Sequence, residues 1–419
     1  MLGEVRRAAC VAVGDELLAG DYPDSNSGAI AVALAELGIA VERFVVLGDR
    51  KGDLESAFYD LCARYQLVVC TGGIGPTLDD VTREAAAAAA GVPLECNADV
   101  LAALKEGYSR RKREMPASNE RQAWFPRGAQ VMPNAIGTAP GFRVWIDGGT
   151  LCVLPGPPHE MKDMLRRELL PWLRSTCGQG PGLVRHSFYM LGLPESAFSD
   201  RAGDWMARGA TPLMGGTAHT GILKVTLLGK GESVEGARAQ VAARAAEVRA
   251  RFAEEIFSED DPRPGAALVQ QLAARGATLA VAESCTGGLV AELLTDVAGA
   301  SRVFRSGWVT YSNESKVSAL GVDPALLERH GAVSREVALA MARGAAERSG
   351  ADFAVSITGI AGPDGGTPEK PVGLVWFGLW TRGGLEAYEQ RFPPVDRASI
   401  RRYAAHVALN LVRLHSRSG

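Results

Sequence analysis

The sequence predicts a multidomain protein of the α/β class. Two observations support this: short β-rich runs alternate with helical stretches, and glycine-rich loops follow the runs that read as strands. A chain of 419 residues is also too long for one ordinary core, because domains average roughly 150 residues. We therefore expect three domains, at residues 1–176, 177–258 and 259–419.

The first block reads as a parallel sheet covered by helices on both faces, a three-layer α/β/α arrangement. Strands and helices alternate. We expect strands at 8–13, 40–47 and 67–70, and helices at 27–37 and from 53 onward. Glycine- and proline-containing loops follow predicted strands at 14–16, 71–76 and 154–158. Ligands of such sheets bind where strands end and helices begin, so this edge is the candidate site of the block.

The segment 71–82 combines a backbone cradle suited to phosphate with two adjacent carboxylates. The candidate cradle residues are Gly72, Gly73, Gly75 and Thr77. Asp79 and Asp80 could hold a divalent cation, and Glu160 could complete its ligand shell. The alternative is a simple turn followed by an acidic helix start, which the helix dipole would favour by itself.

The second block reads as a small α+β unit. A Gly/Pro cluster at 177–182 marks its start, and an acidic, proline-containing stretch at 258–265 reads as a linker to the third block. Between them we expect strands at 186–191 and 222–228, and helices at 195–207 and 234–252. A further helix is expected at 266–275, where the third block begins.

In the third block a predicted strand from Thr278 leads into a turn that holds Ser284. Gly287 and Gly288 would let a ligand approach the backbone, and the free amides of the following helix could bind an oxyanion or a phosphate. A serine in this position is well placed to act as a nucleophile. The alternative is a serine that only caps the helix.

A serine nucleophile needs a base, and the sequence offers Lys316. The segment 306–316 places Tyr311 and Lys316 just after an apolar strand, where they could fold back over the serine turn. A lysine acts as a base only if its pKa is lowered, so the alternative is a solvated surface lysine. The histidines at 330, 406 and 415 have no serine-hydrolase context.

A third glycine-rich loop, residues 355–366, again follows a β-branched run, and we expect the three strand-end loops to converge on one site. Arg397 and Arg401 open the last predicted helix. Their guanidinium groups could bind a phosphate or could be ordinary surface charges.

The motifs of the third block resemble the nicotinamide mononucleotide deamidase domain of the CinA (competence/damage-inducible protein A) family. They are Ala-Glu-Ser-Cys-Thr-Gly-Gly at 282–288, Val-Thr-Tyr-Ser-Asn at 309–313, His-Gly-Ala-Val-Ser at 330–334 and the loop 358–366. The resemblance implies hydrolysis of nicotinamide mononucleotide to nicotinate mononucleotide and ammonia without a metal. It also implies that Ser284 is the nucleophile, Lys316 the base and Tyr311 its helper. The implied ligand contacts are Thr286, Gly287, Gly288, Asn313, Thr358, Gly359, Arg397 and Arg401.

The first block resembles the molybdopterin-binding-like domain at the front of full-length CinA proteins, through segments 24–27, 71–82, 137–141 and 155–161. This resemblance implies either an ADP-ribose pyrophosphatase that uses a divalent metal, Mg²⁺ or Co²⁺, or a domain that binds a phosphorylated pterin-like ligand. The middle block resembles the family's small KH-type domain, yet it has no GxxG run between helices. A homodimer is expected.

Composition limits the partners. Hydrophobic residues make up 47% of the chain and charged residues 22%, which suits packed domains. The net charge of −3 gives no basis for binding nucleic acid. Seven cysteines without a CxxC pair indicate reduced thiols, and the first residues do not read as a signal or a membrane span, so a cytoplasmic protein is expected. Two functions stay open: a hydrolase of nucleotides, or a molybdopterin-like ligand-binding or competence-related protein without hydrolase activity.

Overall fold

The structure is a computed structural model that describes residues 5–176, 182–231 and 233–417. Contacts group the chain into two compact units: Met1–Arg185 with Gly229–Val241, and His186–Leu228 with Ala242–Gly419. The Gly/Pro cluster expected to mark the first domain boundary lies, from 177 to 181, outside the described residues. The division into three domains therefore stays a prediction.

The front unit is built on a six-stranded sheet with the order β2-β1-β3-β8-β7-β6. The strands are β1 (Arg7–Val13), β2 (Ala40–Leu47), β3 (Leu67–Thr71), β6 (Gln130–Met132), β7 (Gly141–Ile146) and β8 (Gly149–Leu154). Strands β2, β1, β3 and β8 run parallel, whereas β7 and β6 are antiparallel additions that the sequence did not indicate. A short hairpin pairs β4 (Leu94–Cys96) with β5 (Trp124–Pro126).

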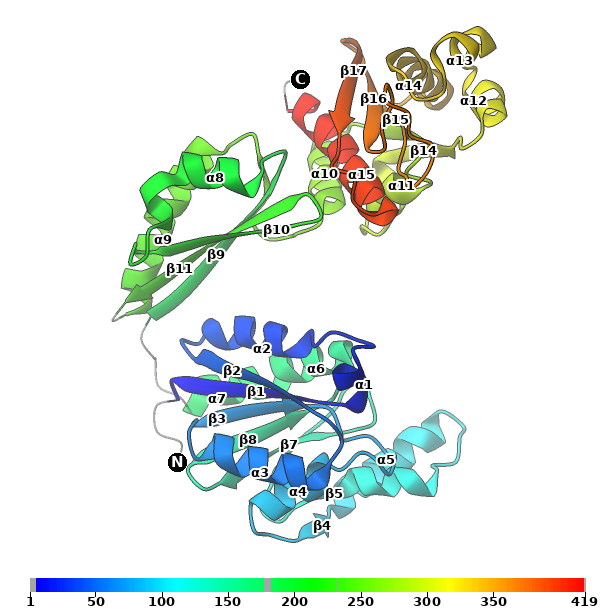
Figure 1. Cartoon of the computed structure of the whole chain (residues 1–419). Helices are drawn as coiled ribbons and strands as arrows, with labels where there is room; N and C mark the ends of the chain where they lie inside the picture. Colours follow the sequence, from blue (N-terminus) through cyan, green and yellow to red (C-terminus); the bar gives the residue numbers. More distant parts are fainter. Residues whose placement is uncertain (1–4, 177–181, 232, 418–419) are drawn as a thin grey trace. The chain divides into compact units, whose positions relative to one another are not determined.

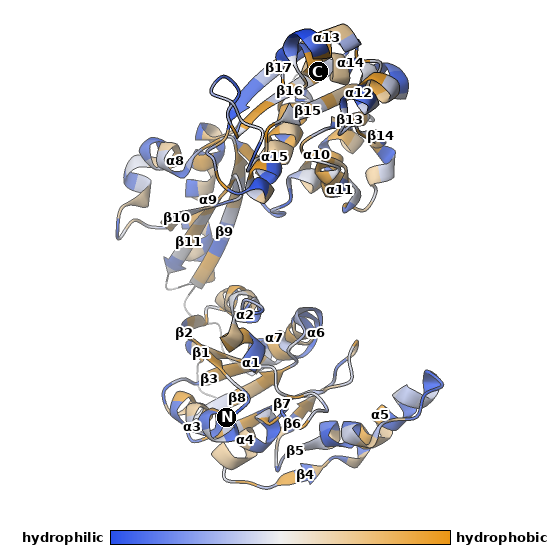
Figure 2. Ribbon diagram, turned by 45° about the vertical axis from the view of Figure 1, so that its right-hand side comes forward, coloured by the Kyte–Doolittle hydropathy of each residue, from blue (hydrophilic) through white to orange (hydrophobic). Residues whose placement is uncertain are grey.

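Helices cover both faces of this sheet (Figure 1). One face packs against α2 (Asn26–Ala35), α6 (Pro158–Met164) and α7 (Leu170–Thr176), and the other against α3 (Lys51–Cys62) and α4 (Thr82–Ala89). Short α1 (Asp15–Ala19) follows β1, and α5 (Ala98–Arg110) has no fully buried residue. Its outer end is hydrophilic in Figure 2. The predicted three-layer arrangement is confirmed. It forms because alternate residues of the buried strands face two opposite helical layers.

The middle block forms its own antiparallel sheet with the order β10-β11-β9-β12. Its elements are β9 (Gly182–Leu191), α8 (Glu195–Ala202), β10 (Leu213–His219), β11 (Ile222–Gly231), α9 (Val234–Arg251) and β12 (Ile256–Ser258). The helix expected at 195–207 ends at Ala202, because Gly203 takes a positive φ of 56°. Strand β10 was not expected.

The last domain has a five-stranded sheet with the order β14-β13-β15-β16-β17. The strands are β13 (Leu279–Glu283), β14 (Phe304–Val309), β15 (Phe353–Gly359), β16 (Leu374–Thr381) and β17 (Gly384–Arg391). The first three in this order, β14, β13 and β15, are parallel, so their C-terminal ends meet at one edge. The predicted convergence of three strand-end loops follows from this order.

Two helical layers enclose this sheet as well (Figure 1). One contains α10 (Pro264–Ala274), α11 (Leu289–Thr295) and α15 (Arg397–His415), and the other contains α12 (Asn313–Leu320), α13 (Pro324–His330) and α14 (Arg335–Ser349). The α/β multidomain fold class is therefore confirmed. In the described part of the chain, no helix combines the length and the apolar character needed to cross a membrane.

Candidate functional site

Ser284 lies in the turn between β13 and α11, at the edge where the parallel strands end. Its amide donates a hydrogen bond of 2.9 Å to the carbonyl of Ile357 in the neighbouring strand β15, which fixes the turn against the sheet. Helix α11 begins only at Leu289, and its N-cap residue is Gly288 with a φ of 96°. Ser284 is therefore not the cap of this helix, and the turn leaves its hydroxyl partly exposed.

Lys316 reaches this hydroxyl from α12. Its Nζ atom lies 3.2 Å from Oγ of Ser284, although the side chain is only 1% exposed. The same amine donates to the main-chain carbonyls of Thr310, Tyr311 and Ser312, at 2.8, 3.3 and 3.5 Å. The carbonyls hold the amine in place beside the serine, so the structure brings the predicted nucleophile and base together.

Burial lowers the pKa of the Lys316 amine below its ordinary value, because the charged form loses its hydration. The nearby Glu314 carboxylate acts in the opposite direction. An uncharged amine has two N–H donors and one lone pair. The two nearer carbonyls, those of Thr310 and Tyr311, can accept both donors, which leaves the lone pair to accept the proton of Ser284. The geometry thus suits proton transfer from the serine to the lysine.

Glu283, the last residue of β13, occupies the helix start that the sequence assigned to a ligand. Its carboxylate is 1% exposed and accepts hydrogen bonds from the amides of Gly288, Val290 and Ala291, at 3.0, 3.1 and 2.9 Å. The expectation that the amides of α11 bind an oxyanion or a phosphate is wrong for these three. A buried carboxylate already neutralises the positive end of the helix.

The two arginines at the start of α15 have different partners. Arg401 donates to the carbonyls of Cys285 and Thr286, at 3.2 and 2.6 Å, and so clamps the serine turn. Arg397 is exposed and donates to the carbonyl of Gly362 and to the hydroxyl of Tyr311, both at 2.7 Å. Arg401, expected as a ligand contact, is therefore occupied by the backbone of the turn.

The other predicted contacts are spread around the site. Tyr311 is 60% exposed, and its hydroxyl meets Arg397. The Thr358 hydroxyl donates to the carbonyl of Ala332, and Gly359 packs so closely on β16 that a side chain there would collide with its backbone. Asn313 is exposed at the start of α12, and Gly287 is exposed with a φ of 61°.

Two hydroxyls near Ser284 are buried without a hydrogen-bond partner, those of Thr286 and Thr310. Sequence motifs indicated Thr286 but neither Thr310 nor Glu283. A signal for Glu283 was present, because a glutamate that ends a wholly apolar strand must find partners inside the protein. Cys285, next to Ser284, is buried, and burial raises the pKa of its thiol to about 12.

The front unit has a cleft of about 730 Å³ at the edge where its parallel strands end. Six carboxylate residues line it, namely Glu16, Asp24, Asp49, Asp79, Asp80 and Glu160, and no lysine or arginine is among its described lining residues. Burial raises the pKa of Asp49, and the carboxylates of Asp15, Glu16 and Asp79 add to this effect. The cleft is therefore strongly negative.

The glycine loop of this cleft is held largely by Asp80. Its carboxylate accepts hydrogen bonds from the amides of Gly75 and Thr77, at 2.7 and 2.8 Å, and from the Thr77 hydroxyl. The Gly72 amide donates to Leu154. Of the predicted phosphate cradle, only the Gly73 amide is left without an oxygen partner in the described chain.

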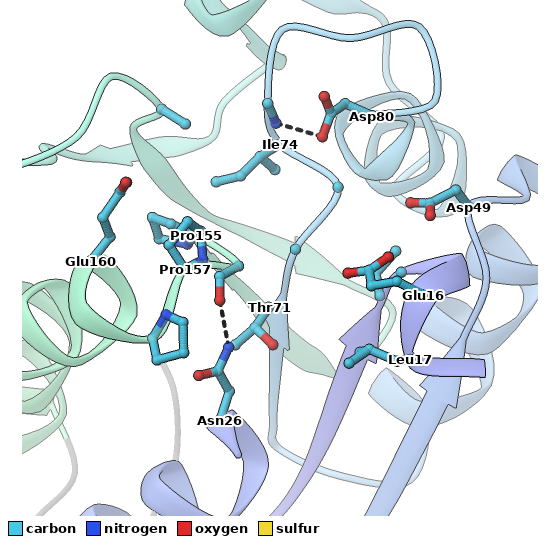
Figure 3. A pocket seen from close by; sticks show the side chains of 18 of the residues that line it. Glu16, Leu17, Asn26, Asp49, Thr71, Ile74, Asp80, Pro155, Pro157 and Glu160 are labelled. Atoms are coloured by element: carbon cyan, nitrogen blue, oxygen red, sulfur yellow. Dashed lines mark hydrogen bonds between the residues drawn. The ribbon is translucent and has the colours of Figure 1, made fainter. Parts of the chain in front are cut away.

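The predicted metal ligands do not form one set. Figure 3 shows Glu160 on one side of the glycine loop, and Glu16 and Asp49 on the other. Glu160 accepts a hydrogen bond of 2.7 Å from Asn134, Asp80 is used by the loop, and Asp79 is exposed. No group of three histidine, cysteine or acidic residues within the described ranges is arranged to hold a metal ion. These side chains do not fit a preformed metal shell.

Together the two folds define a class: a molybdopterin-binding-type α/β unit at the front, and at the end an α/β domain with a serine–lysine pair. The family model described as "Probable molybdopterin binding domain" matches residues 9–175, and the model described as "CinA C-terminal domain" matches residues 264–415.

Relatives match over almost the whole length. A CinA-like protein of Anaeromyxobacter dehalogenans is 43% identical over 96% of this chain and 98% of its own, and one of Geobacter sulfurreducens is 42% identical over 97% and 98%. A solved structure, competence/damage inducible protein CihA from Agrobacterium tumefaciens, is 44% identical, covers 36% of this chain and 96% of its own, and has a TM-score of 0.35. The chain belongs to the CinA family.

Proposed function

We propose that the last domain hydrolyses the carboxamide of nicotinamide mononucleotide, giving nicotinate mononucleotide and ammonia. One observation carries the proposal: the amine of Lys316 is buried and lies 3.2 Å from Oγ of Ser284. A buried lysine with a lowered pKa beside a partly exposed serine hydroxyl has the arrangement of an activated nucleophile.

The first half of the reaction forms an acyl-enzyme. Oγ of Ser284 bonds to the carboxamide carbon, and its proton passes to Nζ of Lys316. The carbon–nitrogen bond then breaks, Nζ returns the proton to the departing nitrogen, and ammonia leaves. In the second half, water adds to the acyl carbon, its proton passes through Nζ to Oγ of Ser284, and the ester bond breaks. The acid product ionises to nicotinate.

The oxyanion donors would be the amides of Cys285 and Thr286. Neither donates to a carbonyl or carboxylate within the ranges that the structure describes, whereas Glu283 accepts the amides further along the turn and helix. Arg401 holds the carbonyls of the same two residues, so their peptide groups are fixed before the substrate binds.

The exposed guanidinium of Arg397 is the proposed contact for the substrate phosphate. It lies at the start of α15, joined to Tyr311 and Gly362. An arginine at the rim can orient the mononucleotide while the ring reaches Ser284. Tyr311 would then act by placing Arg397 rather than by moving a proton.

The decisive experiment follows ammonia after nicotinamide mononucleotide is added to the protein. We expect release from the wild type, loss of release in Ser284→Ala and in Lys316→Met, and normal release in Ser349→Ala. Ser349 is a suitable control because its hydroxyl donates to helix carbonyls of α14 and accepts from the amide of Ala351, and none of these bonds involves Ser284 or Lys316. A wild-type protein that releases no ammonia would favour the binding protein without hydrolase activity.

For the front unit we infer a cleft that binds a phosphorylated ligand, with ADP-ribose cleavage as its activity. The observation that supports a divalent cation, Mg²⁺ or Co²⁺, is the charge of the cleft. A diphosphate would be repelled by the six lining carboxylates unless cations came with it. A phosphorylated pterin-like ligand is the second candidate for the same cleft.

The front activity is tested by incubating the protein with ADP-ribose and Mg²⁺ or Co²⁺. We expect cleavage that stops when the metal is chelated and that falls in Asp80→Ala, because Asp80 holds the glycine loop. Cleavage that continues under both conditions would contradict the proposal.

A further inference from the structure

The hydroxyl of Thr310 is a polar group for which the mechanism above has no use. Thr310 is 1% exposed, and its Oγ1 atom has no hydrogen-bond partner. A buried hydroxyl without a partner is unfavourable, so it is expected to be paired by a water or a ligand atom in the working enzyme.

Thr310 is tied to the catalytic pair on both sides. Its amide donates 2.8 Å to the carbonyl of Glu283, the residue before the nucleophile, and its carbonyl accepts 2.8 Å from Nζ of Lys316. Val309 pairs with Glu283 across the two strands, so Thr310 lies beside Ser284.

The direction of the side chain follows from strand alternation. Ala282 and Trp308 are register partners and pack into the same core, on the face that carries α12 and α14. Ser284 and Thr310 directly follow the last residues of β13 and β14, and continued alternation places their side chains on that face. Lys316 comes from α12 on the same face, so alternation places the unpaired hydroxyl on the side of the sheet from which the amine approaches Ser284.

The second half of the reaction needs a water close to both Nζ and the acyl carbon. Lys316 is almost completely buried, so a water that reaches its Nζ atom needs polar partners inside the protein. The unpaired hydroxyl of Thr310, whose carbonyl already binds Nζ, is such a partner.

We propose that the Thr310 hydroxyl positions the water that hydrolyses the acyl-enzyme. Thr310 donates to the water oxygen, and the water donates to Nζ of Lys316. The water oxygen then bonds to the acyl carbon, its proton passes to Nζ and on to Oγ of Ser284, and the ester bond breaks. Thr310 is thus a positioning residue for the second half of the reaction. This inference rests on the proposed deamidase function.

The test uses Thr310→Val, which keeps the shape and removes the hydroxyl, in the full-length protein. Rapid-quench measurements follow ammonia, and intact mass measures protein that carries the acyl group. We expect a burst of about one ammonia per enzyme, then turnover slowed at least about tenfold, with the acyl-enzyme accumulating. Thr310→Ser should keep turnover near the wild-type rate.

Controls separate this role from a structural one. Thr278→Val removes a buried hydroxyl that is paired with Asp352, and it should lower stability without a burst. Thr310→Ala repeats the test if the valine variant does not fold. Wild-type kcat in folded Thr310→Val or Thr310→Ala, or slow turnover of these variants without a burst, would overturn this inference and leave the deamidase proposal standing. A wild type that releases no ammonia would overturn the deamidase proposal and this inference with it.

Discussion

The amine of Lys316 lies 3.2 Å from the hydroxyl oxygen of Ser284, although the two residues are 32 positions apart in the chain. Strands β13 and β14 are adjacent and parallel, so the serine turn and the segment before α12 meet at one sheet edge. Carbonyls of residues 310–312 then hold the amine in place. This relationship makes the pair a candidate for catalysis and gives the predictions below.

The rate of ammonia release should rise with pH. Only the uncharged amine of Lys316 can accept the serine proton, and burial lowers its pKa. The rising limb of kcat/KM should therefore have its midpoint below the value of about 10.4 found for a free lysine. Glu314→Gln removes a carboxylate that raises this pKa, so the midpoint should move to lower pH. A midpoint that moves upward in this variant would contradict Lys316 as the base.

Removing the Glu283 carboxylate should cost both stability and turnover. Glu283→Ala leaves three amides of the turn and helix without their acceptor, which should lower the free energy of unfolding by roughly 2–4 kcal/mol. Glu283→Gln should lose less, because one oxygen still accepts. Chemical denaturation and kcat should be measured together, with exposed Glu292→Gln in α11 as the control. Equal free energies of unfolding for the alanine variant and the wild type would show that these hydrogen bonds do not stabilise the fold.

The two arginines should differ in their kinetic effects. Arg401→Ala should lower kcat about tenfold or more with little change in KM, because Arg401 fixes the turn and not the substrate. Arg397→Ala should mainly raise KM if its guanidinium contacts the phosphate. Steady-state kinetics of both variants decide the assignment, and the reverse pattern would assign the phosphate to Arg401.

The thiol of Cys285, next to Ser284, should not react with alkylating reagents. Burial raises the pKa of Cys285 to about 12, so alkylation of the native protein near pH 8 should spare it. Cys96 is exposed and should be modified under the same conditions. Peptide mapping gives the sites, and ammonia release should survive the treatment. Rapid modification of Cys285 with loss of activity would point to a cysteine nucleophile instead.

Much of the fold was readable from local pattern. The alternation of β-rich and helical stretches indicated β1, α2, β2, α3 and β3. The inner strands β1 and β3 were readable because buried parallel strands are continuous apolar runs, whereas β2 lies at the sheet edge and is more exposed. Strands β6 and β7 were missed because they are antiparallel additions with no helix between them and β8. The end of α8 was missed because Gly203, inside an expected helix, takes a backbone conformation that stops it.

The two glycine-rich loops show where local pattern failed. The sequence assigned their amides to ligand anions, yet Glu283 accepts them in one loop and Asp80 in the other. An amide binds whichever acceptor lies closest with good geometry, and a carboxylate within the same segment competes directly with a ligand. Composition cannot reveal that competition.

The sequence by itself determined much of the alternation of strands and helices, the position of the serine in a turn, and the family to which the chain belongs. These depend on side-chain periodicity and on motifs, which are local. Tertiary structure alone decided that Lys316 is buried against Ser284, that Arg401 holds the turn, and that Glu160 lies apart from Asp80. Burial and hydrogen-bond partners depend on which distant segments pack together, and that is set by strand register and sheet order.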